Sequence, residues 1–533
     1  MSDCDPAAAA QSYAEGLAAA RVGDRKTALR EFLMALALDP SVAAHRRAAM
    51  GALRTASGYS TLPDIVIEGL KICAADAELD LQPLAMVSKQ IIEADARLPD
   101  ALAAATDHVA TLETKLKDGA WDWLLDNPLL VPMLSRAVNI SLPLERLLTA
   151  LRRHALLWLT QNESPCAAHA SHPDVFTAMA LQGDTCGFPW PVTPLEQRAL
   201  ARLSQTTGEA GVVMRACYES VGGIDPAYRL PAALDERRKV LRDLAARAAA
   251  IPILAMSDDA VSARVRQQYE TFPYPPWDAP ALDADNSNTQ SLRILSAGCG
   301  TGQGAVSMAR AYAKAAITAI DLSGASLAYA ERQAEKFAPG RITFGVGDIL
   351  SVENLGQSFD LIECIGVLHH MANPAAGLAA LTRVLAPGGK LKLALYSERG
   401  RAGVVAARAL VKSLGLRDTP EDMRTFRQEL LSLPEAHAAR SVVDSIDFFS
   451  LPALHDLVFN VQEHRFTPLG LDELLRTAEL SFGGFIATPG LDLAAYRRDN
   501  PHDPDAHDLA AWDAFEQRHP DSFANMFLFW ARK

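Results

Sequence analysis

The sequence has few cysteines and no long apolar run, and both features exclude certain classes of protein. Its seven cysteines are scattered and form no C-x-x-C pair, which argues against a disulfide framework or a zinc knuckle. Reduced thiols are typical of the cytoplasm, so we expect a cytoplasmic protein. No stretch of about 18 uninterrupted apolar residues occurs, and the acidic start Met1–Pro6 lacks the features of a secretory signal. We therefore expect no association with a membrane.

Positive charge is also in deficit. The net charge is −13 over 533 residues. This argues against binding to nucleic acid or anionic lipid through overall electrostatic attraction. The stretch His502–Asp508 holds two histidines and three aspartates, but it includes a proline and no further ligand cluster lies nearby. We interpret it as a surface loop and expect no metal. Hydrophobic residues, in contrast, make up 49% of the chain, which is enough for sizeable cores.

A glycine-rich turn follows the apolar run Leu292–Ala297. Gly298, Gly300 and Gly302 stand at alternate positions, and a helical segment, Ala305–Ala313, follows at once. Glycines let the backbone approach a ligand where a Cβ would collide, and the start of a helix offers free N–H groups to a carboxylate or phosphate. In open α/β sheets, ligands bind at such turns at the carboxyl ends of strands.

Further apolar runs follow this turn along the chain. The run Ala316–Ile320 ends in Asp321, about 20 residues past the glycines, where a carboxylate can hold both hydroxyls of a ribose. Helical stretches separate most of the later runs, which lie at residues 342–346, 359–364, 390–396, 484–487 and 526–531. This alternation predicts an α/β fold with a doubly wound, mostly parallel sheet.

The order and spacing of these elements resemble a class I S-adenosylmethionine-dependent methyltransferase. The resemblance covers roughly Asp259 to the C-terminus, about half the chain. It implies a seven-stranded sheet whose last strand is antiparallel. The segments 268–277, 395–398 and 461–467 resemble the subset of that family in which the domain is fused to a tetratricopeptide-like helical region.

The resemblance implies S-adenosylmethionine as the cofactor and assigns its contacts. The backbone around Gly298, Gly300 and Gly302 would hold its methionine part. Asp321 would hold the ribose, and Asp348 would accept a hydrogen bond from the adenine amino group. The other residues that the resemblance places around the cofactor are Ser296, Cys299, Leu322, Ile349, Cys364 and Gly366.

Ser296 departs from the family pattern, which usually has Asp or Glu at that position. A serine can donate a hydrogen bond but brings no charge to the ammonium group of the cofactor. An alternative nucleotide enzyme, one that uses a nicotinamide or flavin, requires the pattern G-x-G-x-x-G. Gln303 makes the pattern here G-x-G-x-G, so we disfavour an oxidoreductase.

The first half of the chain is predicted to be all-α. Residues 7–40 resemble one tetratricopeptide repeat, because small or apolar residues and a final proline fall at its offsets: Gly16, Ala28, Phe32, Ala35 and Pro40. We expect a tetratricopeptide-like repeat region over 1–115, a further helical region over 116–255 and the methyltransferase domain over 256–533. Repeat surfaces commonly bind peptides or proteins, so the helical half is a candidate for holding a protein partner.

A pair of arginines interrupts the apolar face of one predicted helix in this half. The helix begins at Ser141, and the pair is Arg152 and Arg153. We interpret both arginines as part of a solvated face rather than as a binding site.

Residues 397–465 are too many for a simple connection and predict inserted helices that cap a substrate pocket. Two groups of residues are expected at that pocket. The first is aromatic and the second is the polar cluster that precedes a predicted helix near Thr467. Together, the expected substrate contacts are Tyr269, Tyr274, Tyr396, Glu463, His464 and Arg465.

Methyl transfer from a sulfonium demands little of side chains, because orientation of the two reactants alone contributes up to ~7–11 kcal/mol. An oxygen or nitrogen nucleophile can still require a base. The candidates are His369 and His370, just past the fourth predicted strand, and Glu398, just past the fifth. For the two histidines the alternative is a role in packing and helix capping.

Two function classes therefore remain. The first is methyl transfer to an oxygen or nitrogen nucleophile, with the helical half holding a partner or the substrate. The second is a helical-repeat adaptor whose cofactor domain is degenerate and not catalytic. The substrate itself is not readable from the sequence: a small hydroxylated molecule and a protein both suit a capped pocket.

Overall fold

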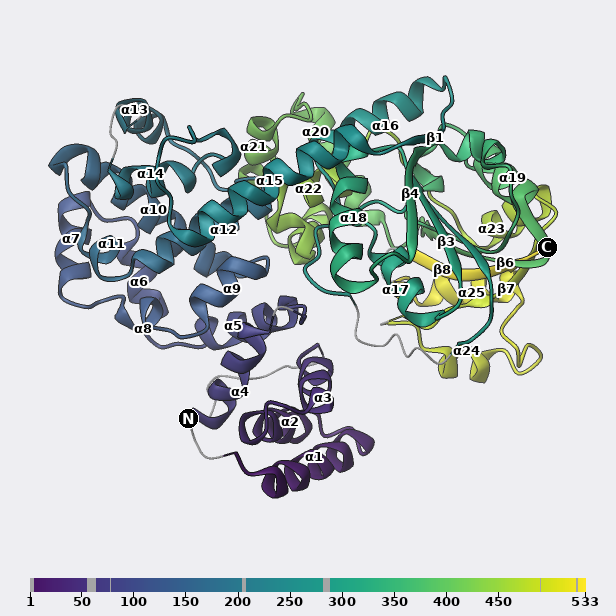
Figure 1. Ribbon diagram of the computed structural model, residues 1–533, viewed down its shortest axis with the longest axis horizontal. Coiled ribbons are helices and arrows are strands. Elements are labelled where there is room, and N and C mark those ends of the chain that lie inside the picture. The colour runs from purple at the N-terminus through teal and green to yellow at the C-terminus, as the bar shows by residue number, and fades with distance from the viewer. Residues whose placement is uncertain are drawn as a thin grey trace. The chain divides into compact units, whose positions relative to one another are not determined.

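The computed structural model describes residues 4–54, 64–76, 78–203, 208–280, 288–488, 490–523 and 526–533. The chain divides into two compact units, which are best described separately (Figure 1). The first comprises Met1–Arg242 with two short segments, Asp278–Leu282 and Phe449–Leu451. The second comprises Asp243–Trp277, Asp283–Phe448 and Pro452–Lys533.

In its described residues, the first unit contains helices and no strand, as predicted. Its apolar side chains form one core cluster that extends from α1 to the start of α15. The helices are α1 (Pro6–Arg21), α2 (Arg25–Leu38), α3 (Ala43–Leu53), α4 (Asp64–Ala75), α5 (Gln82–Glu93), α6 (Leu98–Ala104), α7 (Val109–Lys117), α8 (Asp122–Leu125), α9 (Leu130–Arg136), α10 (Leu142–Asn162), α11 (Ala167–Ser171), α12 (Pro173–Cys186), α13 (Pro194–Leu203), α14 (Glu209–Ala216), the 3₁₀ turn η1 (Val221–Gly223) and α15 (Ala232–Ala250).

Helices α1 and α2 form a hairpin over the segment that resembles a tetratricopeptide repeat. A Cβ added at Gly16 would lie 2.6 Å from the ring of Phe32, so the glycine lets α1 approach α2 closely. Ala28 is buried in the same contact region. The hairpin has the expected form, and its membership of the repeat family stays a prediction.

The interpretation of Arg152 as solvated is wrong. Its side chain lies on α10 and is fully buried. The guanidinium group lies 4.0 Å from the ring centre of Tyr218, donates a hydrogen bond of 2.8 Å to the carbonyl of Pro191 and approaches Glu196 at 3.5 Å. The adjacent Arg153 is partly exposed. Two adjacent arginines on one helix thus point to different environments, because consecutive positions are separated by about 100° around the axis.

This difference gives a test of the first unit's core. Arg152→Met should lower the free energy of unfolding by about 3–5 kcal/mol, because it leaves Glu196 buried without its cation. Arg153→Met, the matched control, should change the same quantity by less than about 0.5 kcal/mol. Urea unfolding followed by circular dichroism measures both. Equal losses for the two variants would contradict the buried position of Arg152.

The second unit is built on one sheet with the strand order β1-β4-β3-β2-β5-β6-β8-β7. Strand β8 runs antiparallel to both of its neighbours, whereas the pairs on the other side of β6 are parallel. The predicted doubly wound, mostly parallel sheet is therefore present, with the antiparallel last strand. The strands are β1 (Ile253–Ala255), β2 (Arg293–Ala297), β3 (Ala316–Asp321), β4 (Ile342–Gly347), β5 (Phe359–Ile365), β6 (Leu385–Tyr396), β7 (Ser481–Phe485) and β8 (Met526–Arg532).

The prediction of seven strands is wrong by one, because β1 adds an eighth at the sheet edge. β1 pairs with β4 in parallel but has only three residues, too few to give a periodic signal in the sequence. Gly345 on β4 makes room for it. A side chain at that position would collide with Leu254.

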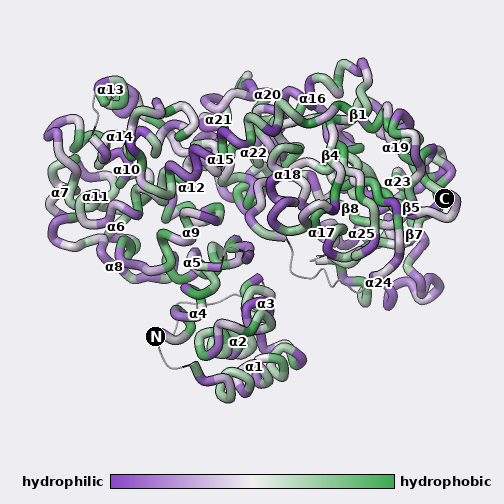
Figure 2. Tube along the Cα trace, viewed as in Figure 1, coloured by the Kyte–Doolittle hydropathy of each residue, from purple (hydrophilic) through white to green (hydrophobic). Residues whose placement is uncertain are grey.

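Helices cover both faces of the sheet (Figure 1). Alternate strand residues point to opposite faces, so Ile294 packs towards α17 and α18 while its neighbour Leu295 packs towards α19, α23 and α25. Figure 2 shows hydrophobic stretches along these strands. The helices are α16 (Ala260–Thr271), α17 (Gln303–Ala311), α18 (Gly324–Phe337), α19 (Pro374–Val384), α23 (Pro468–Thr477), α24 (Leu493–Asp499) and α25 (Leu509–Arg518), with 3₁₀ turns η2 (Ile349–Leu355) and η3 (Leu368–His370).

The long segment after β6 is helical, as predicted. We call residues 397–465 the cap segment. It contains α20 (Ala402–Ser413), α21 (Pro420–Ser432), η4 (Ala438–Asp444), η5 (Ile446–Phe449), α22 (Leu451–Leu454) and a π-helical turn, η6 (His455–Phe459). Among the described residues of the chain, no helix is long and apolar enough to cross a membrane.

Candidate functional site

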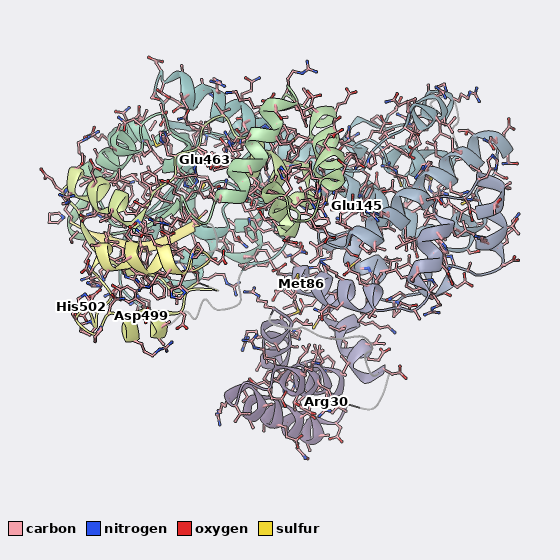
Figure 3. All side chains as sticks on the ribbon, turned by 180° about the vertical axis from the view of Figure 1, so that it is seen from behind. Arg30, Met86, Glu145, Glu463, Asp499 and His502 are labelled. Atoms are coloured by element: carbon pink, nitrogen blue, oxygen red, sulfur yellow. The ribbon has the colours of Figure 1, made fainter. Side chains whose placement is uncertain are left out.

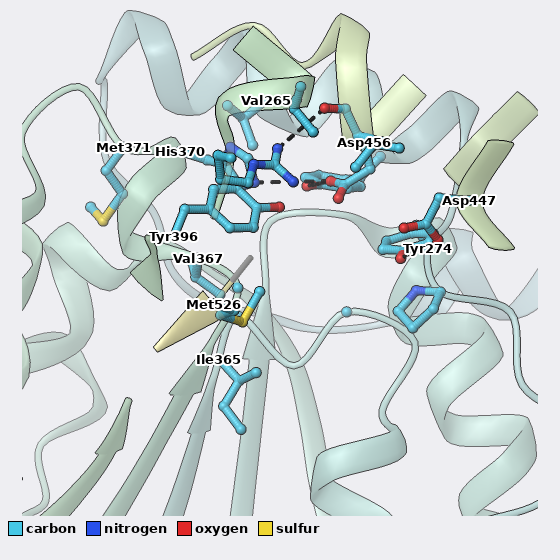
Figure 4. A pocket seen from close by; sticks show the side chains of 18 of the residues that line it. Val265, Tyr274, Ile365, Val367, His370, Met371, Tyr396, Asp447, Asp456 and Met526 are labelled. Atoms are coloured by element: carbon cyan, nitrogen blue, oxygen red, sulfur yellow. Dashed lines mark hydrogen bonds and ion pairs between the residues drawn. The ribbon is translucent and has the colours of Figure 1, made fainter. Parts of the chain in front are cut away.

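A cavity of about 790 Å³ lies within the second unit at the carboxyl ends of its parallel strands (Figure 4). The strand order reverses between β2 and β5, and crevices at such reversals are where open α/β sheets bind ligands. From the sheet side, the wall is formed by residues that directly follow β2, β3, β4 and β5. From the other side, it is formed by residues of the cap segment and of α16.

The glycine turn after β2 forms part of this wall. Gly298, Gly300 and Gly302 all have left-handed backbone angles, with φ of +70°, +52° and +84°. A Cβ at Gly298 would lie 2.5 Å from the side chain of Val367, so a larger residue would displace the wall as well as strain the backbone. Gly298 and Gly300 line the cavity, whereas Gly302 lies behind them at the start of α17.

Two carboxylates stand at the ends of the next two strands. Asp321 accepts hydrogen bonds from the backbone N–H groups of Gly300 (2.8 Å) and Ser323 (2.9 Å). Burial raises the pKa of Asp321, and these two bonds partly offset the rise. Asp348 accepts hydrogen bonds from Leu350 N–H (2.9 Å) and from the hydroxyl of Ser257. Each carboxylate oxygen has a second lone pair, so both groups retain capacity to accept from a ligand.

The other residues expected around a cofactor divide between the cavity wall and the layer beneath it. Cys299, Leu322, Ile349 and Gly366 line the cavity. Ser296 and Cys364 are buried in their strands beneath the wall. The partner of Ser296 across the β2–β5 pair is Glu363, a buried carboxylate that pairs with Lys392 at 3.2 Å. The acid that the family has at position 296 is therefore absent there, and a carboxylate stands on the neighbouring strand instead.

The two histidines after β5 have different surroundings. His370 lines the cavity, and its Nδ1 is 2.7 Å from the carbonyl of Gln462, to which it donates. Its Nε2 then carries the lone pair of the neutral ring and accepts a long hydrogen bond of 3.4 Å from the side-chain amide of Asn460. Burial lowers the pKa of His370, and the negative charge of Asp456 partly offsets this. His369 does not line the cavity: it is fully buried and stacks on Tyr396 with ring centres 3.7 Å apart.

Tyr396 forms the floor beneath the cap segment. Besides His369, its ring contacts the guanidinium group of Arg401, which lies 3.7 Å from the ring centre. Arg401 in turn forms a 2.5 Å ion pair with Glu463, and both side chains are almost completely buried. Tyr396 and Arg401 line the cavity, whereas Glu463 stands behind Arg401.

The remaining polar residues predicted at the pocket support its wall without forming it. The backbone N–H of His464 donates to the carbonyl of His369 (2.7 Å), and Arg465 pairs with Glu463 at 3.1 Å. Glu398 is exposed and, like these residues, is not part of the cavity wall. The cluster Gln462–Arg465 thus holds the segment that orients His370.

Two aspartates of the cap segment line the cavity and were not predicted from the sequence. Asp456, on the π-helical turn η6, accepts a 2.5 Å hydrogen bond from the hydroxyl of Tyr269. Asp447, on η5, accepts a 3.0 Å hydrogen bond from the hydroxyl of Tyr274. Both tyrosines line the cavity, and their contact with a substrate stays a prediction. Turns of π-helix are frequent at functional sites, but no sequence pattern marks this one.

Groups that could ligate a metal occur elsewhere. In the first unit, Glu113, His154 and Cys166 bring potential ligand atoms within 4.8 Å of one another. His154 and Glu113 are already hydrogen-bonded at 2.8 Å, and the N–H of Ala167 satisfies the other oxygen of Glu113, which gives the cluster a structural role. In the second unit, the side chain of His502 is 66% exposed at the surface (Figure 3).

Comparisons with known proteins add to this geometry. Residues 294–389 match the model of a family described as a methyltransferase domain. An uncharacterized protein of Synechococcus is 37% identical over 169 residues, which are 28% of this chain and 40% of the relative. A ubiquinone biosynthesis O-methyltransferase of Paracidovorax citrulli is 34% identical over 125 residues, 22% of this chain and 49% of the relative. The chain thus spans about half or less of the length of these relatives.

A solved structure is also similar to part of the chain. It is PKMT2 from Rickettsia typhi in complex with AdoHcy, with 15% identity and a TM-score of 0.36, and the match covers 52% of this chain and 54% of that one.

The residues at the cavity suit the cofactor that the family uses. Gly366 lines the cavity with a φ of +75°, and a Cβ there would meet no atom within 4 Å, so its absence leaves the wall open for a ligand. Asp321 and Asp348 offer acceptors for hydroxyl and amino groups, and Ile349 offers an apolar surface at the same wall. Residues 294–389 are therefore a methyltransferase domain within a class I fold, and its cofactor is S-adenosylmethionine.

Proposed function

We propose that the second unit transfers the methyl group of S-adenosylmethionine to an oxygen or nitrogen nucleophile of an acceptor. The observation that carries this proposal is the continuity of one cavity. Its sheet side has the glycine turn, Asp321 and Asp348, and its cap side has Asp456, with His370 of η3 4.0 Å from it. A cofactor on the sheet side would thus share an enclosed space with an acceptor on the cap side, which is what in-line transfer between two bound molecules requires.

Within this proposal, the residues on the sheet side bind the cofactor. The carboxylate of Asp321 accepts from the ribose hydroxyls, Asp348 accepts from the adenine amino group, and Ile349 packs on the adenine ring. Backbone groups at Gly298 and Gly300 hold the methionine part. When bound, the cofactor supplies an electrophilic methyl group, and these residues fix where that group lies.

On the cap side, His370 acts as the general base. Its Nδ1 proton is committed to the carbonyl of Gln462 at 2.7 Å, so Nε2 is the atom that accepts a proton. Because burial lowers the pKa of His370, the ring is neutral near pH 7 and can accept. Tyr396 and Arg401 close the wall beside it and exclude water.

We further propose that the first unit is a tetratricopeptide-like region, over about residues 1–115, followed by helices to about 255. Such a region would hold a protein or peptide partner. The α1–α2 hairpin, with Gly16 packed against Phe32, supports this proposal.

The ribose assignment can be tested by binding alone. Asp321→Asn should weaken S-adenosylmethionine binding by roughly 10- to 150-fold, because charge-assisted hydrogen bonds contribute about 1.5–3 kcal/mol. The change is isosteric and retains one acceptor oxygen for the N–H of Gly300 or Ser323. Asp444→Asn, at an exposed position, is the matched control and should bind normally. Calorimetric affinities that are equal for Asp321→Asn and the natural chain would rule out the assignment.

The base assignment can be tested by pH. With a labelled methyl donor and an acceptor from cell extract, His370→Gln should lower kcat by about 10²–10⁴-fold while cofactor affinity is retained. In the natural enzyme kcat should fall on the acid side with an apparent pKa below 6.5, since protonated His370 cannot accept a proton.

That acid limb should vanish in His370→Gln and persist in the surface control His502→Gln. A limb that persists in His370→Gln would show that another group is the base.

A further inference from the structure

The side chains that line the cavity include more negatively charged than positively charged groups. Its wall contains five aspartates and two arginines. Two of the aspartates, Asp321 and Asp348, belong to the sheet side. Asp447 and Asp456 belong to the cap segment, where the acceptor would bind, and Figure 4 shows Asp456 near His370 and Asp447 near Tyr274.

Both arginines of the wall are engaged by carboxylates outside the cavity. Arg401 pairs with Glu463 at 2.5 Å. Arg399 pairs with Asp513 at 3.0 Å and with Glu516 at 2.6 Å, both on α25. Their charges are therefore largely compensated before any ligand enters.

The two cap carboxylates, in contrast, receive hydrogen bonds from neutral groups. In the described part of the chain, Asp456 accepts from the hydroxyl of Tyr269 (2.5 Å) and the amide of Asn460 (3.3 Å). Asp447 accepts from the hydroxyls of Tyr274 (3.0 Å) and Ser445 (3.2 Å). Neither carboxylate forms an ion pair with lysine or arginine among the described residues.

This arrangement is electrostatically costly without a ligand. Carboxylates withdrawn from water are normally paired with a cation, because neutral donors replace only part of their hydration. Burial raises the pKa of Asp447 to about 6, and the negative charge of Asp456 adds to the rise. A cation placed between the two groups would remove this cost.

Two arginines of the cap segment hold the turn that carries Asp456 in place. Arg401 donates to the carbonyl of Leu457 (3.2 Å), and Arg408 donates to the carbonyls of Val458 (3.1 Å) and Asn460 (2.9 Å). These bonds satisfy carbonyls at the end of the π-helical turn that carries Asp456. The carboxylate of Asp456 is thus positioned before an acceptor binds.

We propose, on the basis of the methyltransferase function above, that the acceptor is an amine that enters as an ammonium ion between Asp447 and Asp456. Its N–H groups donate to the two carboxylates, and its positive charge supplies the missing counter-ion. An acceptor that carries a carboxylate or phosphate at this position would be repelled. An uncharged alcohol would gain hydrogen bonds but no charge compensation.

The reaction balances with the groups present. One N–H proton of the ammonium group passes to Nε2 of His370, whose neighbour Asp456 lies 4.0 Å away and stabilises the imidazolium ion. The freed nitrogen lone pair then forms a bond to the methyl carbon as the carbon–sulfur bond breaks. The electron pair of that bond stays on sulfur, which becomes a neutral thioether. The products are the methylated amine and S-adenosylhomocysteine.

Ligand-observed NMR with the full chain saturated by S-adenosylhomocysteine tests the charge preference directly. The probes are butylammonium, 1-butanol and butyrate, which share one alkyl chain. Butylammonium should bind at least about tenfold more tightly than either of the others, a difference of about 1.4 kcal/mol. Equal or tighter binding of the alcohol or the carboxylate, or no binding of the amine to the loaded protein, would overturn the proposal.

Isosteric variants of the two aspartates test whether the preference for an ammonium ion arises at this site. Asp447→Asn and Asp456→Asn should each weaken butylammonium binding by about tenfold and leave S-adenosylhomocysteine binding unchanged. Asp444→Asn is the control, because it is three residues away and exposed. Amine affinity that is unchanged in both variants would contradict the site. Loss of S-adenosylhomocysteine binding by the natural chain would instead contradict the methyltransferase function.

Chemical blocking of a cell extract tests the same proposal with natural acceptors. Amines in the extract are acetylated with an active ester, and hydroxylamine then restores any acetylated phenols. Labelled methyl transfer from S-adenosylmethionine should occur with the untreated extract and be lost after blocking. Transfer that survives blocking would show a hydroxyl acceptor and overturn the amine proposal, whereas no transfer to the untreated extract would count against the proposed function.

Discussion

The hydrogen bond from Gly300 N–H to Asp321 ties the glycine turn to the end of β3, and the site depends on it. The bond is 2.8 Å long, and the N–H groups of Gly298 and Cys299 reinforce it through the carbonyl of Ile320. Together these contacts fix the backbone at the point where the strand order reverses. Gly298 and Gly300, both in left-handed conformation, line the cavity there without a side chain.

A second set of interactions shapes the opposite wall. Arg401 and Arg408 bind carbonyls at the end of η6, and His370 binds the carbonyl of Gln462. These side chains therefore hold backbone carbonyls, while carboxylates of the cap segment face the cavity. Among the described residues, both arginines of the cavity wall are already paired with carboxylates, and this distribution of charge supports an amine as the acceptor.

The sequence predicted the sheet well, because strands and the turns between them depend on local patterns. Apolar runs, glycines at alternate positions and an aspartate at the end of a strand each leave a mark within a few residues. The predicted strands occur, although the run at 484–487 overlaps the observed β7 (Ser481–Phe485) by only two residues, and Asp321 and Asp348 lie at the cavity. Strand β1 was not predicted, because three residues are too few to show a strand periodicity. The burial of Arg152 was not predicted, because its partners come from segments distant in the sequence.

The cap side was less predictable for a related physical reason. Asp447 and Asp456 lie at the cavity only because helical turns place them opposite strands that come much earlier in the chain. No local sequence pattern indicates that arrangement. Gln462–Arg465 was identified as a polar cluster, yet its side chains and backbone support the wall from behind. The sequence likewise did not show that His370 rather than His369 lines the cavity, because the two residues are adjacent in the chain and only the structure separates their environments.

The most direct test of the account is a calorimetric titration of the purified chain with S-adenosylmethionine and, separately, with NAD(H) at fixed salt. The account predicts a dissociation constant on the order of micromolar, about −8 kcal/mol, for S-adenosylmethionine and no binding of NAD(H). Binding of neither would contradict the enzyme and favour an adaptor with a degenerate cofactor domain. Binding of NAD(H) alone would contradict the assignment of the cofactor site itself.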